Sequence, residues 1–161
     1  MTTDARTWAS AHNACGDAQD WIATLPDGAT MADAWRGCRR SDWMLWALHV
    51  AHHATPGGPR SFACDCAERA LTREREAGRE PDARSWEAIR VARAYLRGEA
   101  TEPEMAAARD VAGAAAAGAA AGAAAGAAAG AAAGAAARDV ARSWQADRLR
   151  SYVPEWPEVD P

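Results

Sequence analysis

The segment of residues 40–50 constrains the fold most, because its pattern predicts a helix that is apolar on nearly every side. One face carries apolar side chains at the i, i+3, i+4 and i+7 positions, which are Trp43, Trp46, Ala47 and Val50. The other side is filled by Met44, Leu45 and Leu48. Ser41 is expected to cap the helix, and Asp42 to lie in its first turn, where the helix dipole favours a carboxylate. Other helices must therefore cover this one.

Tryptophans supply much of the expected core, since the chain has eight of them but only one phenylalanine and two tyrosines. With 161 residues, it is long enough to bury a core without disulfides or metal, as one domain or one domain with an appendage. We expect Trp43 and Trp46 at the centre of this core and Trp8 at its periphery. The side chains predicted to form the core are Trp21, Trp35, Trp43, Trp46, Cys66, Trp86, Ile89 and Leu96.

Helix start and stop signals divide residues 1–100 into about five helices. Thr30 and Asp33 resemble a capping box, with aspartate in place of the usual glutamate. Turn signals occur at residues 26–28 and 56–59, and Gly78 and Gly98 are expected to end two further helices. No stretch alternates apolar and polar residues as a strand would. The predicted class is therefore all-α, with a compact helical bundle over residues 1–100 that is followed by a long Ala/Gly-rich helix.

Residues 112–137 contain only alanine and glycine, and from Gly118 onwards a glycine recurs at every fourth position. A glycine costs a helix about 1 kcal/mol relative to alanine, so one in four is tolerable. We predict a nearly continuous helix over residues 101–152 that starts with a capping signal at Thr101 and Glu104. The alternative is a break that folds the helix into a hairpin. The glycines expected to allow close helix packing are Gly118, Gly122, Gly126, Gly130 and Gly134.

Two copies of the block Arg-Asp-Val-Ala flank this tract, at residues 109–112 and 138–141. At about 100° per residue, Val111 and Val140 would fall within roughly 20° of each other on a continuous helix. The two blocks would then share a face, which suits a contact with a partner. Residues 153–161 contain three prolines and three acidic residues, which predicts an extended acidic tail.

Charge and hydropathy argue against two classes of partner. The net charge of −4 provides no general attraction to nucleic acid or to an anionic membrane. The Ala/Gly tract is long enough to cross a membrane, but it lacks leucine, isoleucine and phenylalanine and has Arg-Asp at both ends. The N-terminus has no basic segment followed by an apolar one, so no signal peptide is visible. We therefore expect a cytoplasmic protein that binds neither nucleic acid nor a membrane.

Histidines and cysteines in the first half of the chain are side chains of the kind that bind zinc. The less favoured interpretation is a metal site formed by His49, His53, Cys64 and Cys66. The favoured one is structural, because Cys-x-Cys differs from the usual Cys-x-x-Cys and because cysteine is often enclosed in helical cores. No pattern places Cys38 or Cys66 against His49 as a Cys/His hydrolase would require. We expect no catalytic residue, no cofactor and no metal.

The order of several residue blocks resembles a known family. These blocks are Ala-Cys-Gly-Asp-Ala-Gln-Asp-Trp at 14–21, Ala-Trp at 34–35, Asp-Trp-Met-Leu-Trp at 42–46 and Asp-Cys-Ala-Glu at 65–68. The likeness continues through residues 87–98 and an Ala-rich region to 144–149. The chain is similar in these blocks to a bacterial immunity protein family, which is assigned to polymorphic toxin systems and is also found in phages. The pure Ala/Gly composition of residues 112–137 departs from that family's more varied Ala-rich segments.

The resemblance implies a small protein that binds and neutralises a partner toxin, with no catalytic residues to carry over. The rival interpretation is a non-enzymatic structural or assembly module, of phage origin, that associates with itself through the Ala/Gly-rich helix to form a homo-oligomer. The expected organisation is a helical bundle over residues 1–100, a long helix over 101–152 and the tail over 153–161. The first hypothesis predicts that residues 1–100 suffice for binding, whereas the second predicts that the tract is essential.

Overall fold

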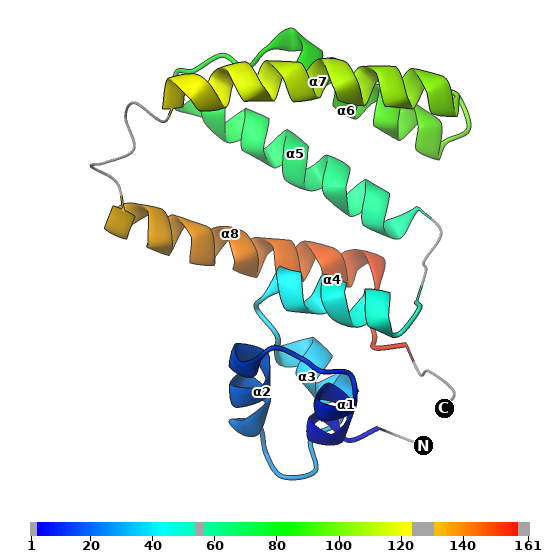
Figure 1. Cartoon of the computed structure of the whole chain (residues 1–161), viewed down its shortest axis with the longest axis vertical. Coiled ribbons are helices and arrows are strands. Elements are labelled where there is room, and N and C mark those ends of the chain that lie inside the picture. The colour runs from blue at the N-terminus through cyan, green and yellow to red at the C-terminus, as the bar shows by residue number, and fades with distance from the viewer. Residues whose placement is uncertain (1–2, 54–56, 124–130, 158–161) are drawn as a thin grey trace. The chain divides into compact units, whose positions relative to one another are not determined.

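The computed structural model describes residues 3–53, 57–123 and 131–157, and it describes their side chains except at 114–123 and 131–137. All regular structure in these ranges is helical, apart from one isolated β-bridge between Asp4 and Thr30. The predicted all-α class is therefore confirmed (Figure 1). The helices of this described part are α1 (Ala5–Ala11), α2 (Gly16–Ala23), α3 (Met31–Gly37), α4 (Ser41–Val50), α5 (Gly58–Glu76), α6 (Ala83–Leu96), α7 (Glu102–Ala123) and α8 (Ala131–Tyr152).

Side chains cap two helices where the sequence signals predicted it. Thr30 and Asp33 form the reciprocal capping box of α3. Thr101 and Glu104 make the same pair of hydrogen bonds at the start of α7. The prediction that Ser41 caps α4 is wrong, because its hydroxyl donates instead to Oε1 of Gln145 at 2.9 Å. That bond ties the start of α4 to α8.

The described contacts divide the chain into two units, each of which we describe by itself. Unit 1 combines Met1–Thr55 with Arg138–Pro161, and unit 2 consists of Pro56–Ala137. The boundaries that we expected at residues 100 and 152 lie within these units and not between them. The difference arises because the last turns of α8 and the segment after it contact α1, α3 and α4. A local sequence signal does not reveal contacts between residues so far apart in the chain.

The core of unit 1 is built on a face of α4 different from the one we expected. Met44, Ala47 and Leu48 are buried on that face, with Met44 only 2% exposed. Trp43 and Trp46, which we placed at the centre, are half-buried at its edges. Met44, Ala47 and Leu48 occupy i, i+3 and i+4 positions and are smaller than tryptophan, so neighbouring helices can approach α4 closely on this face. The two indoles lie on either side of it.

Trp8, which we expected at the periphery, belongs to the core of unit 1. It is 6% exposed, its ring stacks on His12 at 4.3 Å between centroids, and it meets Trp46 edge-on at 5.8 Å. The expectation failed because the short helix α1 has too few residues to show a strong apolar stripe.

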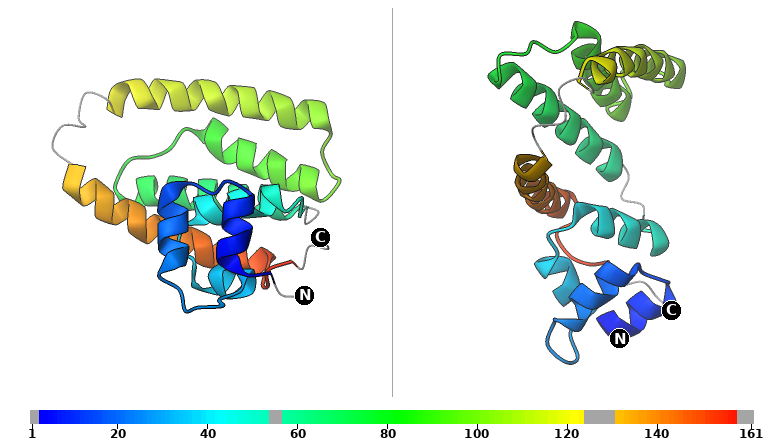
Figure 2. Two further views of the ribbon diagram at one scale, coloured as in Figure 1. Left: turned by 60° about the horizontal axis from the view of Figure 1, so that its bottom comes forward. Right: turned by 60° about the vertical axis from the view of Figure 1, so that its left-hand side comes forward.

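The segment after α8 is not a solvated tail up to residue 157. Val153 is 6% and Trp156 8% exposed, and the Trp156 ring contacts the rings of Trp8 and Trp35. The Trp35 indole donates a hydrogen bond to the carbonyl oxygen of Val153 at 3.0 Å. In Figure 2 this C-terminal segment runs back towards the N-terminal helices of unit 1. The prediction of an extended acidic tail is therefore wrong for residues 153–157, because two apolar side chains anchor them.

Unit 2 contains the whole of α5, α6 and α7 together with the first turns of α8, residues 131–137, and α6 packs on both of the other whole helices. The contacts of α6 with α7 are the most extensive, and α6 also packs on α5, whereas α5 and α7 contact each other little within the described part. Figure 1 shows α7 lying alongside α6. Arg93 of α6 forms ion pairs with Asp65, at 3.0 Å, and with Glu68 of α5. Helix α6 is thus the middle of the three, and a fourth helix could complete a bundle between α5 and α7.

The prediction of a continuous helix over residues 101–152 concerns residues that the structure does not fully describe. Helix α7 extends to Ala123 and α8 starts at Ala131, and residues 124–130 between them lie outside the described part. The residues that would distinguish a continuous helix from a hairpin, 124–130, are therefore outside the described part. The five glycines expected to pack helices closely also fall outside the residues whose side chains are described.

Candidate functional site

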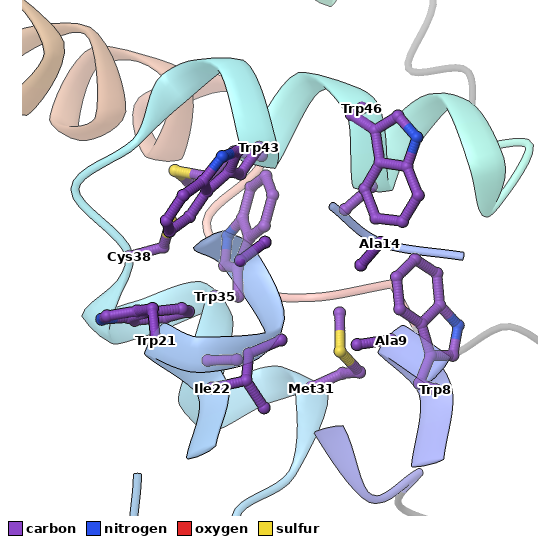
Figure 3. A pocket seen from close by; sticks show the side chains of 14 residues that line it. Trp8, Ala9, Ala14, Trp21, Ile22, Met31, Trp35, Cys38, Trp43 and Trp46 are labelled. Carbon is purple, nitrogen blue, oxygen red and sulfur yellow. The ribbon is translucent and has the colours of Figure 1, made fainter. Parts of the chain in front are cut away.

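Two hollows in the described structure are candidates for binding, and the first lies in the core of unit 1. It is lined by side chains of α1–α4 and their connections, and Figure 3 shows Trp8 and Trp46 on one side of it and Trp21, Trp35 and Trp43 on the other. The indoles of Trp21 and Trp43 are 5.9 Å apart between centroids. All four predicted core tryptophans of unit 1 therefore line one apolar space.

The size of this first hollow excludes a ligand-binding role for the pocket as it stands. Its volume is about 40 Å³. An apolar cavity that takes benzene measures about 150 Å³, and functional pockets measure about 300–1,000 Å³. The hollow is thus several times smaller than either. We therefore interpret it as a packing defect between large rigid rings.

The second hollow is an open groove in unit 2, which we call the α5–α7 groove. Its volume is about 610 Å³, within the range of functional binding sites. Its surface is predominantly apolar, and Ala63, Ala67 and Ala70 present an exposed row of small side chains along α5. The residues that line it are Arg60, Ala63, Cys64, Ala67, Ala70, Leu71, Ser85, Ala88, Ile89, Ala92, Met105, Arg109, Ala112 and Gly113.

Helix geometry explains why the α5–α7 groove exists. On α5, Ala63, Ala67 and Ala70 are separated by four and then three residues, so they form one face. Helix α6 contributes Ser85, Ala88 and Ala92, which are separated by three and then four residues. Alanine lets two helices approach but fills little of the space beyond them. With α5 and α7 on either side of α6, the space between them stays open.

Charge at the groove has one sign. Its lining includes Arg60 and Arg109 and no carboxylate. The Arg60 guanidinium carbon lies 5.1 Å from the centroid of the Tyr95 ring, and neither arginine has an ion pair with a described residue. Elsewhere in unit 2, six arginines form ion pairs with carboxylates, namely those at positions 75, 79, 84, 90, 93 and 97. The groove is therefore an apolar site with positive charge that other described side chains do not neutralise.

The four candidate metal ligands are divided between the units. His49 and His53 belong to unit 1, where His49 is exposed, and Cys64 and Cys66 belong to unit 2, where Cys64 is buried. Over the described ranges, no three histidine, cysteine, aspartate or glutamate side chains gather as a metal site requires. Within each unit, the described residues thus offer no such donor set.

Two cysteines have environments that oppose thiolate chemistry. Burial raises the pKa of the Cys38 thiol, which exchanges hydrogen bonds with the backbone of Arg40 and not with a histidine. Burial also raises the pKa of Cys64, although Arg93 acts in the opposite direction. A nucleophilic or metal-binding cysteine needs a lowered pKa and access. Both thiols act as small apolar side chains.

The remaining predicted core residues lie in unit 2 and are only half-buried. Cys66, Trp86, Ile89 and Leu96 all have intermediate exposure, and Ile89 lines the groove. The indole nitrogen of Trp86 is buried without a hydrogen-bond partner, while the Arg75 guanidinium carbon lies 4.5 Å from the ring centroid. The sequence identified the apolar faces of these helices but not how little of each face is covered.

Comparisons with known proteins provide no relative for this chain. No family model, no curated protein and no solved structure matches it. The resemblance to an immunity protein family therefore rests on the order of residue blocks in the sequence. Among the helices of the described part, none is both long enough and apolar enough to cross a membrane.

Proposed function

We propose that this protein is a non-enzymatic binding protein of the immunity type, which neutralises a partner toxin by protein–protein contact in the cytoplasm. The observation that supports this most is the α5–α7 groove, because it is open, apolar and of the size that binding sites have. The raised pKa of the Cys38 and Cys64 thiols opposes a nucleophilic role for these two side chains. The sequence resemblance supplies the class of partner.

The proposed binding surface also changes our expectation that residues 1–100 suffice for binding the partner. Met105 and Arg109 of α7 line the groove, so a fragment of residues 1–100 would lack one of its walls. It would also lack Val153 and Trp156, which are buried in unit 1. We therefore expect neutralisation to require α7 and residues 138–157 in addition to residues 1–100.

Growth protection tests the proposal. The tagged full chain is used to isolate a partner from its native host, and the gene for that partner is then expressed in cells with or without this protein. We expect the partner to arrest growth and the full chain to restore it. Ala67→Trp, which fills the groove, should abolish protection, whereas Ala107→Trp on an exposed position outside the groove lining should preserve it. Restored growth with Ala67→Trp would contradict a role for the groove.

A second candidate function, self-assembly through a continuous Ala/Gly-rich helix, is favoured by two exposed valines. Val111 is 46% and Val140 58% exposed, one in each Arg-Asp-Val-Ala block. Deleting residues 118–129, which are three Gly-Ala-Ala-Ala repeats, distinguishes the two functions. Assembly predicts an oligomer in sedimentation that the deletion dissociates. Neutralisation by the groove predicts protection that the deletion leaves intact.

A further inference from the structure

The α5–α7 groove has features that specify the chemistry of its occupant, and the first is its shape. The lining runs along α5 from Arg60 to Leu71, which is about 16 Å or three turns of helix. Helices α5 and α7 form the walls and α6 the floor. A helix is the element that fits a channel bounded by helices, because helices pack at about 8–10 Å between axes. An occupant of about three turns would complete a four-helix arrangement.

The side chains of the lining limit what the occupant presents to the groove. Ala63, Ala67 and Ala70 on one wall and Gly113 on the other are small and exposed. Cys64 of α5 and Met105 of α7 also line the groove and are each only 6% exposed. Small walls leave room for leucine-sized side chains from the occupant, arranged at i, i+3, i+4 and i+7 on one face. The occupant is therefore amphipathic, with its apolar face turned into the groove.

Charge selects between acidic and basic helices. Arg60 and Arg109 line the groove and form no ion pair with a described residue. Six other arginines of unit 2 are already paired with carboxylates. The guanidinium groups of Arg60 and Arg109 can form charge-assisted hydrogen bonds with carboxylates at the edge of an incoming helix. A basic helix would meet two uncompensated like charges.

We propose that the α5–α7 groove binds an acidic amphipathic helix of about three turns from a partner protein, with Arg60 and Arg109 holding its carboxylates. This inference rests on the proposed function, since it names the part of the partner that the groove recognises. A second copy of this chain is a different occupant, and the test below includes it as an outcome.

Peptide binding to the full chain tests the proposal. The probe is a fluorescein-labelled helical peptide of about four turns, so that it spans the groove, with leucine and alanine on one face and glutamate on the other. A matched peptide has lysine in place of each glutamate, and anisotropy reports binding. We expect the acidic peptide to bind with an affinity that salt weakens, and the basic peptide to bind at least about ten-fold more weakly. Equal binding of both, or binding of neither, would overturn the proposal.

Two pairs of variants locate the binding. Ala67→Trp should weaken the acidic peptide more than about ten-fold by filling the groove, while Ala107→Trp should leave it unchanged. Arg109→Glu should weaken it about five- to ten-fold, since it replaces an attraction by a repulsion. Its control is Arg138→Glu, because Arg138 starts the second copy of the same four-residue block, is exposed and does not line the groove. Helical circular dichroism verifies that each variant is folded.

The outcomes separate this inference from the proposed function. If the acidic peptide binds in the groove but the isolated partner does not arrest growth, then the groove chemistry is correct and the toxin class is wrong. If protection is observed but persists with Ala67→Trp and Arg109→Glu, then the groove inference is overturned while neutralisation stands. If sedimentation shows a dimer that Ala67→Trp dissociates, then the occupant is a second copy and the acidic-partner inference is wrong.

Discussion

Unit 1 and unit 2 bury different kinds of side chain, although both are helical. The buried residues of unit 1 include Trp8, Trp35, Leu149 and Trp156, which come from both ends of the chain. Those described in unit 2 are smaller or fewer, namely Gly58, Phe62, Cys64, Ala94 and Met105. Large rings close unit 1 to a residual space of about 40 Å³, whereas alanine-lined helices leave about 610 Å³ open in unit 2. The closed core of unit 1 is suited to a scaffold, whereas the open groove of unit 2 is suited to binding.

Electrostatic contacts do not offset the sparse core of unit 2. Its ion pairs are largely exposed, such as Arg90 with Glu87 and Arg97 with Glu99. Exposed pairs of this kind contribute about 0–1 kcal/mol each. Unit 2 should therefore open locally more often than unit 1, as regions with few buried apolar contacts do.

The largest expected effect comes from Trp35→Ala in unit 1. Trp35 is 2% exposed, contacts the Trp156 ring and donates to the Val153 carbonyl, which the substitution leaves unpaired. We expect a loss of about 3–5 kcal/mol in the free energy of unfolding, measured by urea titration with circular dichroism. Trp86→Ala in unit 2 is the matched comparison and should cost only about 1–2 kcal/mol, since that ring is half-buried and its N–H has no partner. Equal losses would remove the contrast between the units.

A smaller effect is expected for Arg150→Met, which tests how α8 is fastened within unit 1. The Arg150 guanidinium donates to the carbonyl oxygens of Trp35, at 3.1 Å, and Cys38, at the C-terminal end of α3. Hydrogen bonds from a charged donor contribute about 1.5–3 kcal/mol, and we expect a loss in that range on urea titration. Arg138→Met is the control on an exposed position of the same helix and should change stability by less than about 0.5 kcal/mol. If Arg150→Met left the free energy of unfolding unchanged, these hydrogen bonds would not stabilise the packing of α8.

The smallest effect concerns pH and the start of α6. Hydrogen bonds from the Arg84 side chain and backbone lower the pKa of Asp82 from 3.8 to about 2. A lowered pKa stabilises the folded form above the unfolded pKa, and this contribution is lost as pH falls through about 2. Wild type should therefore be more stable than Asp82→Asn at pH 5, and the difference should vanish below pH 2. A difference that is constant from pH 5 to below pH 2 would contradict the role of the ionised cap.

The sequence predicted what depends on neighbouring residues. The capping pairs Thr30–Asp33 and Thr101–Glu104 were predictable because each involves residues three apart. The all-helical class was predictable because helix periodicity is also local.

Contacts between distant residues could not be predicted in this way. The Trp35–Val153 hydrogen bond spans more than a hundred residues, and nothing in the Pro-rich composition of residues 153–161 indicates that Trp156 is buried. Similarly, the sequence shows that α5 has an apolar face but not that the face stays uncovered. The groove and its two arginines could therefore be identified only in the structure.

Native-state thiol labelling tests most directly whether unit 1 is closed and unit 2 open. Cys38 of unit 1 and Cys64 of unit 2 are 5% and 6% exposed, so static burial does not distinguish them. Two single-cysteine variants, with the other cysteines replaced by alanine, are reacted with a thiol reagent at increasing urea concentrations below the unfolding transition. We predict that Cys64 reacts faster than Cys38 and with a weaker dependence on urea, because it is exposed by local opening of unit 2. Equal rates with the same urea dependence, or faster reaction of Cys38, would contradict the account.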